Sequence, residues 1–259
     1  MSIINLKYKK IYAKIKTKIL YRPEERVVGE FMIVDNRYTF VAEKAWGDRF
    51  NIIPSVTCKS VPAAISAHPD MTLFQLEEKV FICAPDCFEE YKKRVFCSGT
   101  TLICGEKQLG STYPEDVAYN VLKINNLALG KILAADPVVL NHLTDKKIEL
   151  INVNQGYSKC SVCTFSGCAI TADEGIFSAL KNRGTEVLKI PYGEIKLTGY
   201  DYGFIGGASG EYKGEIFFFG DLDSVSYGQK IREFICSKGK TINEIKNYPL
   251  TDVGTITFC

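Results

Sequence analysis

Short apolar runs and amphipathic segments alternate along most of the chain. From Ile11 to Ile19 the odd positions are mostly apolar and the even positions are mostly lysine, and this period of two predicts a half-buried strand. The stretches 38–42 and 79–83 are rich in β-branched and aromatic residues, so they predict two further short strands. An apolar run at 216–219 predicts a buried strand as well.

Signals for helix starts and ends lie between the predicted strands. Asp136 and Pro137 place an N-cap and a first-turn proline before an apolar segment, and Asp173 caps another. Gly184 and Gly239 mark the ends of two helices, and Gly239 suits a left-handed C-cap. Four helices are predicted on this basis, at 85–94, 138–143, 174–181 and 227–237. Strands and helices therefore alternate, which is typical of an α/β protein.

A pattern of strand, turn and strand recurs every 40 to 50 residues or so. The five recurrences lie around 68–83, 114–132, 158–171, 202–219 and 251–258, and most are separated by a helix. The chain contains no linker rich in Pro, Gly or Ser. We therefore predict a single domain over residues 1–259, of which 1–60 is the part that the pattern defines least.

Composition and charge restrict the choice of partners. The 32 basic and 30 acidic residues give a net charge of +2, which removes the usual electrostatic reason to expect nucleic acid or an anionic membrane. The lysines at 10–18 are predicted to form a solvated strand face; the alternative is a basic anchor for acidic lipid. No apolar run approaches the length of a membrane span, and lysines interrupt the N-terminal apolar residues that a signal peptide would need. The prediction is a cytoplasmic protein with reduced cysteines.

Two local motifs have both a chemical and a structural interpretation. Cys160, Cys163 and Cys168 include a C-x2-C pair, but an extended strand directs neighbouring side chains to opposite faces and no fourth ligand is evident. Metal binding and disulfide redox chemistry are the alternatives, and buried core cysteines are the favoured interpretation; no metal or cofactor is predicted. The glycine-rich stretch 203–210 resembles a phosphate loop, but a strand follows it instead of a helix, so a tight hairpin turn near a ligand pocket is favoured.

Few residues offer acid–base chemistry. The chain has two histidines, of which His142 lies within a predicted helix and His68 lies in a loop two residues before Asp70. A loop histidine beside a carboxylate can titrate near neutrality, although a simple turn would also explain it. Asp116 and Asp201 lie among aromatic residues at strand entrances, a setting typical of small-molecule pockets, and turn or cap roles are equally open.

Several of these segments resemble an uncharacterised bacterial family of the guanidino-group-modifying enzyme superfamily. That superfamily includes arginine deiminase, amidinotransferase and dimethylarginine dimethylaminohydrolase. The resemblance covers about residues 60–259 and rests on 67–71, 113–116, 155–161, 169–176, 199–210 and 249–254. It implies a pentein-like α/β-propeller of five ββαβ units with a polar pocket at its centre.

The enzymes' catalytic residues transfer only in part. Their cysteine nucleophile near the C-terminus corresponds to Thr255 or Thr257, and the only terminal thiol is that of Cys259. Their histidine in the fourth unit is missing, because 220–227 contains none. A threonine hydroxyl without an activating base is a poor nucleophile at neutral pH.

The leading prediction is a pseudoenzyme that binds a small polar ligand, of guanidino or amino-acid-like chemistry, in the central pocket. Carboxylates would pair with a cationic group, while Asn120, Lys159 and Ser209 would hold the polar ends. The alternative is a hydrolase acting on C–N bonds of guanidino compounds, with Cys259 or Cys160 as nucleophile and His68 or Asp223 as base; a third possibility is a protein-interaction module. The predicted catalytic residues are Cys259 and His68, and the predicted ligand-binding residues are Asp70, Asp116, Asn120, Lys159, Cys160, Asp201 and Ser209.

Overall fold

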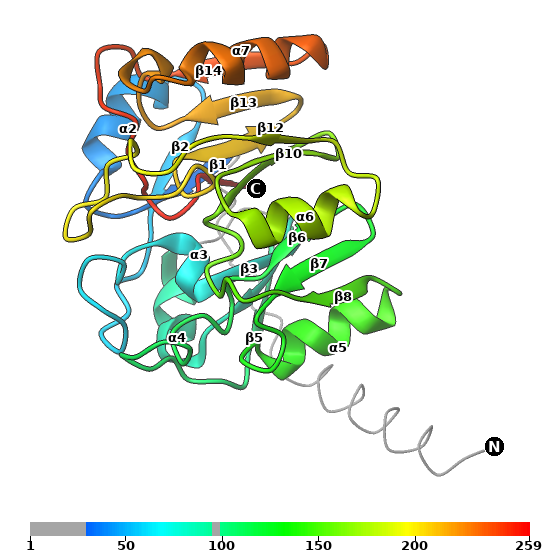
Figure 1. Ribbon diagram of the computed structural model, residues 1–259. Coiled ribbons are helices and arrows are strands. Elements are labelled where there is room, and N and C mark those ends of the chain that lie inside the picture. The colour runs from blue at the N-terminus through cyan, green and yellow to red at the C-terminus, as the bar shows by residue number, and fades with distance from the viewer. Residues whose placement is uncertain (1–29, 95–98) are drawn as a thin grey trace.

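The structure, a computed structural model, describes residues 30–94 and 99–259. It is a mixed α/β fold of small sheets and peripheral helices (Figure 1). The strand predicted at 11–19 lies outside the described residues. None of the described helices is long and apolar enough to span a membrane.

The described strands form five three-stranded sheets with one shared pattern. In each sheet the middle strand pairs antiparallel with the first strand and parallel with the third. In the order first, middle and third, the sheets are β15 (Thr257–Phe258), β1 (Phe31–Val34) and β2 (Asn51–Pro54); β3 (Leu73–Glu77), β4 (Val80–Cys83) and β5 (Thr101–Cys104); β6 (Leu122–Ile124), β7 (Leu127–Gly130) and β8 (Glu149–Asn152); β9 (Val162–Phe165), β10 (Cys168–Thr171) and β11 (Val187–Lys189); β12 (Ser209–Tyr212), β13 (Glu215–Phe218) and β14 (Thr241–Glu244).

A helix connects the two parallel strands in every sheet, as a parallel pairing requires. These helices are α2 (Thr39–Trp46), α4 (Pro85–Arg94), α5 (Pro137–Asp145), α6 (Glu174–Lys181) and α7 (Gly228–Ser237). Two short elements, α3 (Pro69–Thr72) and the 3-10 turn η1 (Leu222–Ser224), complete the described secondary structure.

The four predicted helices are confirmed as α4, α5, α6 and α7, because their end signals are local. The Asp136 carboxylate accepts hydrogen bonds from the backbone N–H groups of Val138 and Val139, and Asp173 accepts one from Ile176. Gly239 follows α7 with a φ of 67°, the left-handed conformation expected of a glycine after a helix.

The strand predicted at 79–83 is confirmed as β4, whereas the strand predicted at 38–42 is wrong. That segment begins helix α2, in which Ala42 and Trp46 are buried four residues apart and Phe40 is 76% exposed. The Trp46 ring packs edge-on against Phe217 and Phe219. Burial at helical spacing therefore outweighs the β propensity of the individual residues.

The last of the five recurrences contains only one strand, β15, and the start of the described chain completes its sheet. β15 pairs with β1, with Met32 opposite Phe258, so the C-terminus lies beside β1 (Figure 1). The Phe258 ring contacts Phe50 and Phe217, which joins this sheet to the sheet of β13. Residues 31–54, within the segment that the sequence pattern defined least, are thus an integral part of the core.

Candidate functional site

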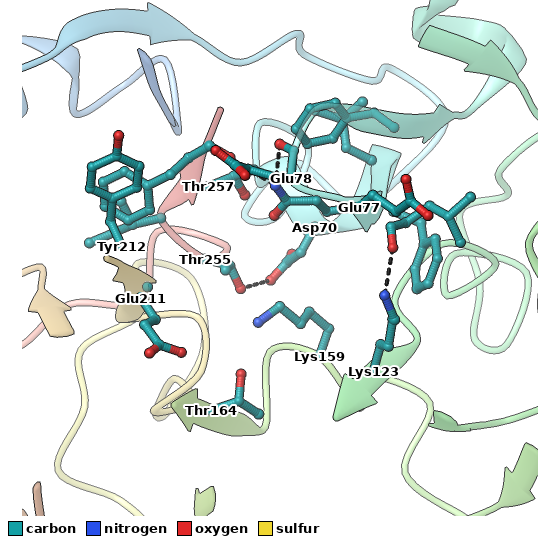
Figure 2. Close-up of a pocket in the computed structure, with 18 of the residues that line it drawn as sticks. Asp70, Glu77, Glu78, Lys123, Lys159, Thr164, Glu211, Tyr212, Thr255 and Thr257 are labelled. Atoms are coloured by element: carbon teal, nitrogen blue, oxygen red, sulfur yellow. Dashed lines mark hydrogen bonds between the residues drawn. The ribbon is translucent and has the colours of Figure 1, made fainter. Parts of the chain in front are cut away.

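A cavity of about 700 Å³ touches the first strand of all five sheets. The strands β3, β6, β9, β12 and β15 each contribute a polar side chain to its lining, and these are Gln75, Lys123, Thr164, Ser209 and Thr257. We call this space the central cavity. Figure 2 shows its polar side chains, with Asp70, Lys159 and Thr255 together in the middle of the view.

Asp70 supplies a buried carboxylate to the central cavity. It lies in α3, just before β3, and is 3% exposed. Its Oδ2 accepts hydrogen bonds from Thr255 Oγ1 at 2.7 Å and from Cys160 Sγ at 3.0 Å. Its Oδ1 has no hydrogen-bond partner within the described part of the chain. A buried carboxylate oxygen without a partner is costly, so this atom is a natural contact for a bound donor.

Lys159 supplies a cation to the same cavity. Its amine forms no hydrogen bond and no ion pair with any of the described residues, Asp70 included, and it points toward the Asp70–Thr255 hydrogen bond (Figure 2). Burial lowers the pKa of Lys159, and the negative charge of Asp70 opposes that shift. Asp70 and Lys159 are therefore an acidic and a basic group of the central cavity that do not neutralise each other by direct contact.

Asn120 holds the turn that carries Lys159 and Cys160. Its Oδ1 accepts from the backbone N–H of Lys159 at 2.8 Å and of Cys160 at 3.2 Å. Its Nδ2 donates to Cys160 Sγ at 2.9 Å and to the Asp70 carbonyl at 3.3 Å. Asn120 is fully buried and lines neither of the cavities described here, so its place in the structure is that of a positioning residue.

Cys160 is held as a neutral thiol. Burial raises the pKa of this thiol well above its ordinary value, and the charge of Asp70 raises it further. The thiolate is the nucleophilic form of cysteine, so this environment suppresses nucleophilic reactivity.

Alkylation is expected to separate Cys160 from a surface thiol. Iodoacetamide at pH 8 should modify the exposed Cys236 at least about 100 times faster than Cys160 in the native protein, because burial raises the pKa of the Cys160 thiol and also blocks access to it. Peptide mass spectrometry against time measures the two rates, and labelling in urea, where both thiols are exposed, is the control. Similar rates in the native protein would contradict the assignment of Cys160 as a protected thiol.

His68 lies between two buried carboxylates. Its Nδ1 is 3.7 Å from Asp252 Oδ1, and its Nε2 is 3.8 Å from Asp35 Oδ2 and has no hydrogen-bond partner within the described residues. The pKa of Asp252 is raised above its ordinary value, mainly because the carboxyl is buried. The neighbouring His68 opposes this shift, and the negative charge of Asp70 adds to it. Asp35 is bound by the guanidinium of Arg37, whose Nε lies 2.9 Å from Oδ1. His68 does not line the central cavity.

His68 and Cys160 instead line a second cavity of about 240 Å³. Asp201, which is exposed to solvent, and Asp252, which is buried, also line this cavity. The remaining lining is mostly aromatic and aliphatic. The Cys160–Asp70 hydrogen bond links the two cavities, because Cys160 lines the second and Asp70 lines the central one.

The other predicted site residues are placed as follows. Ser209 is buried at the start of β12 and lines the central cavity. Asp116 lines neither cavity; its Oδ2 accepts from the Tyr157 hydroxyl at 2.5 Å. Cys259 also lines neither cavity, since it follows β15, exchanges backbone hydrogen bonds with Phe31 and lies in the apolar cluster around Cys83. The structure therefore brings Asp70, Lys159 and Ser209 together and leaves Cys259 away from them.

The glycine-rich stretch 203–210 is not a hairpin turn, which corrects the prediction. Its residues 203–208 precede β12 and its last two residues begin that strand, whereas the hairpin between β12 and β13 turns at Lys213–Gly214. A Cβ at Gly207 would lie 1.9 Å from Asp252 Oδ1, and one at Gly206 would lie 2.5 Å from the Cys160 carbonyl. These glycines are needed because backbone packs directly against the site residues.

Asp252 and Thr255 are site residues that the sequence did not single out for binding. Thr255 is buried, has a φ of 69° and lies beside Asp70 in the central cavity. A β-branched residue in the left-handed region is strained, and such strain is concentrated at functional sites. The only local signal was the sequence Asp252-Val253-Gly254, in which the glycine marks an unusual backbone turn.

The three cysteines of the C-x2-C region are buried, as predicted, and do not converge. Cys163 lies opposite Ile170 across the β9–β10 ladder, and Cys168 lies opposite Phe165. Among residues 30–94 and 99–259, no three His, Cys, Asp or Glu side chains are grouped so that they could hold a metal ion.

Comparison with known proteins gives a sequence family and a fold. The profile described as "Family of unknown function (DUF6873)" matches residues 33–257. No curated protein matches the sequence. A dimethylarginine dimethylaminohydrolase from Pseudomonas aeruginosa, a cysteine-to-serine variant complexed with citrulline, superposes with a TM-score of 0.53 at 9% identity, over 87% of this chain and 95% of that one.

Two further structures of dimethylarginine dimethylaminohydrolase are similar. An adduct with S-methyl-L-thiocitrulline has a TM-score of 0.52 at 8% identity, over 89% of this chain and 97% of that one. An adduct with 4-chloro-2-hydroxymethylpyridine has a TM-score of 0.50 at 10% identity, over 85% and 93% of the two chains. At such low identities the likeness shows the fold alone.

Proposed function

Because the chain belongs to the family of unknown function DUF6873 and shares the fold of dimethylarginine dimethylaminohydrolase, we propose that it binds a small dipolar ligand, an amino acid or guanidino compound, in the central cavity. We propose further that it does so without the thiol chemistry of the guanidino-modifying enzymes. Two of the similar structures are a complex with citrulline and an adduct with S-methyl-L-thiocitrulline, which are molecules of this class.

In this proposal the five sheets are five ββαβ units of one α/β-propeller domain. Two observations support that arrangement. The sheets share one pairing pattern with a helix in the same connection, and the central cavity touches the first strand of each. A propeller places the innermost strands around one axis, so a cavity on that axis would contact all of them.

The unpaired Asp70 oxygen is the observation that carries the proposal. Among the described residues, no donor reaches Oδ1, which is buried in the wall of the cavity, and none pairs with the Lys159 amine in the same space. A ligand whose ammonium or guanidinium contacts Asp70 and whose carboxylate contacts Lys159 would satisfy both groups at once. A ligand with only one charge would satisfy one group and leave the other, so a dipolar molecule fits best.

The remaining lining supplies neutral hydrogen-bond groups, the three carboxylates of Glu77, Glu78 and Glu211, and the amines of Lys123 and Lys213. Ser209 and Thr164 present hydroxyl groups, and Glu211 lies on the same strand as Ser209. Such groups recognise polar substituents between the two charged ends of a ligand. The near-neutral net charge of the chain agrees with a small-molecule partner instead of nucleic acid.

Loss of thiol chemistry is supported by the placement of the candidate nucleophiles. Cys160 is a buried thiol with a raised pKa, and Cys259 lies in an apolar cluster. The threonines at the expected nucleophile position have no neighbouring histidine in the central cavity, because His68 lines the second cavity. A hydrolase that uses Cys160 or Cys259 therefore has no support from the geometry.

A thermal-shift experiment tests the proposal. L-arginine, L-citrulline and agmatine, which is arginine without its carboxylate, are added to the wild-type protein, to Asp70→Asn and to Asp116→Asn. A ligand at about 100 times its Kd stabilises by about 2.7 kcal/mol, which corresponds to a rise in Tm of roughly 5 to 10 °C for a protein of this size. We expect the rise in the wild-type protein and in Asp116→Asn, but not in Asp70→Asn, and a smaller rise with agmatine.

Asp116→Asn is the matched control, because Asp116 is also buried with one unpartnered oxygen but lines neither cavity. Equal shifts in Asp70→Asn and in the wild-type protein, or no shift with arginine, citrulline or the other common amino acids, would contradict binding at the central cavity.

A further inference from the structure

The second cavity is lined mainly by aromatic and aliphatic side chains. Four aromatic side chains line it, and they are Tyr157, Tyr200, Tyr202 and Phe204. The rings of Tyr202 and Phe204 meet at 85° with their centroids 6.1 Å apart, so they form two nearly perpendicular walls. Tyr200 and Tyr202 are 48% and 38% exposed, which leaves this side of the cavity open to solvent.

The charges at this cavity are acidic. Asp201 lies at the exposed rim and Asp252 lies in the buried part, whereas no lysine or arginine among the described residues lines the cavity. His68 is the only basic side chain in that lining, and it lies beside Asp252. Aromatic faces and carboxylates both attract cations, so the ligand expected here is a cation.

Apart from Asp201 and the tyrosine hydroxyls on the solvent side, and the unpartnered His68 Nε2, the cavity offers few free hydrogen-bond acceptors. Asp252 Oδ2 already accepts from the backbone N–H of Phe204 at 2.8 Å, and its Oδ1 accepts from that of Gly254 at 3.0 Å. The Tyr157 hydroxyl donates to Asp116. The rest of the lining includes the apolar side chains of Ile65, Met71 and Leu197.

We propose that this second cavity is a binding site for a small quaternary ammonium cation, such as a trimethylammonium group. The methyl groups of the cation contact the rings of Tyr200, Tyr202 and Phe204, and Asp201 supplies the counter-charge at the rim. A guanidinium or primary ammonium carries several N–H donors, and the part of the lining away from the Asp201 carboxylate and His68 Nε2 is aromatic or apolar and would leave some of them without acceptors, which is costly in a buried site. A cation without N–H groups avoids that cost and gains the interaction with the aromatic faces. The inference does not rest on the function proposed for the central cavity.

Titration calorimetry with tetramethylammonium chloride tests the site, with sodium chloride and guanidinium chloride at the same concentration as controls. We expect the wild-type protein to bind tetramethylammonium, and we expect Tyr200→Ala and Tyr202→Ala each to weaken the affinity roughly tenfold. Tyr202→Phe retains the ring and should bind like the wild-type protein. Tyr192→Ala is the matched control, because Tyr192 is 45% exposed and its ring is 5.6 Å from that of Tyr202, but it does not line the cavity.

Three results would overturn the proposal. They are no binding of tetramethylammonium, unchanged affinity in the Tyr200→Ala and Tyr202→Ala double variant, and guanidinium binding as tight as that of tetramethylammonium. The central cavity is tested separately, since an Asp70→Asn protein that has lost its response to arginine is still expected to bind tetramethylammonium.

Discussion

Replacing Gly254 with alanine is expected to lower the free energy of unfolding by about 3 to 5 kcal/mol. Gly254 has a φ of 72°, a conformation that costs an L-residue energy. A Cβ there would also lie 2.2 Å from His68 Cβ and 2.5 Å from His68 Cα, and the backbone atom cannot move without displacing α3. Urea unfolding followed by circular dichroism measures the change.

Gly239→Ala is the control for the backbone conformation alone. Gly239 has a φ of 67°, but a Cβ there would meet nothing within 4 Å. We expect Gly239→Ala to lower the free energy of unfolding by only about 1 to 2 kcal/mol. If the two variants were equally stable, the close contact between Gly254 and His68 would not be a constraint of the fold.

Replacing Asn120 with alanine is expected to lower the free energy of unfolding by about 2 to 4 kcal/mol and to weaken ligand binding in the central cavity. The substitution removes the acceptor for the buried Cys160 N–H and one acceptor for the partly buried Lys159 N–H. A buried donor without an acceptor costs about 1 to 3 kcal/mol, and the empty volume adds to that cost. The turn that places the Lys159 amine would also be less well defined.

Asn152→Ala is the control for loss of a side-chain amide at the surface. Asn152 Oδ1 accepts from the backbone N–H of Ile132 at 3.1 Å in an exposed setting, where water can replace it. We expect Asn152→Ala to lower the free energy of unfolding by less than about 1 kcal/mol, as measured by urea unfolding under the same conditions. An Asn120→Ala protein with the stability of Asn152→Ala and an unchanged response to ligand would refute the positioning role.

The elements that could be predicted from the sequence are those with local causes. Asp136 and Asp173 cap helices through N–H groups two or three residues away, so α5 and α6 are recognisable without any tertiary contact. The alternation of strand and helix, and the recurrence of strand pairs, follow from hydrophobic periods within single segments. The segments at 67–71 and 155–161, which the sequence predicted to contribute to one polar site, both line the central cavity through Asp70 and Lys159.

The elements that could not be predicted depend on residues far apart in the sequence. Helix α2 follows from the packing of Trp46 against Phe217 and Phe219, and the last sheet requires β1 to join β15. The site has the same origin: Thr255 bonds to Asp70 across 185 positions, and Cys160 bonds to Asp70 across 90.

The sequence by itself therefore determined the mixed α/β class of the fold and the local elements. Only the tertiary structure decided which groups are paired at the site. Within residues 30–94 and 99–259, one Asp70 oxygen and the Lys159 amine have no partner in the central cavity, and His68 lies with Asp252 at the second cavity. The physical reason is that pairing depends on distances of about 3 Å between side chains, which are fixed by the packing of whole sheets and not by any local sequence pattern.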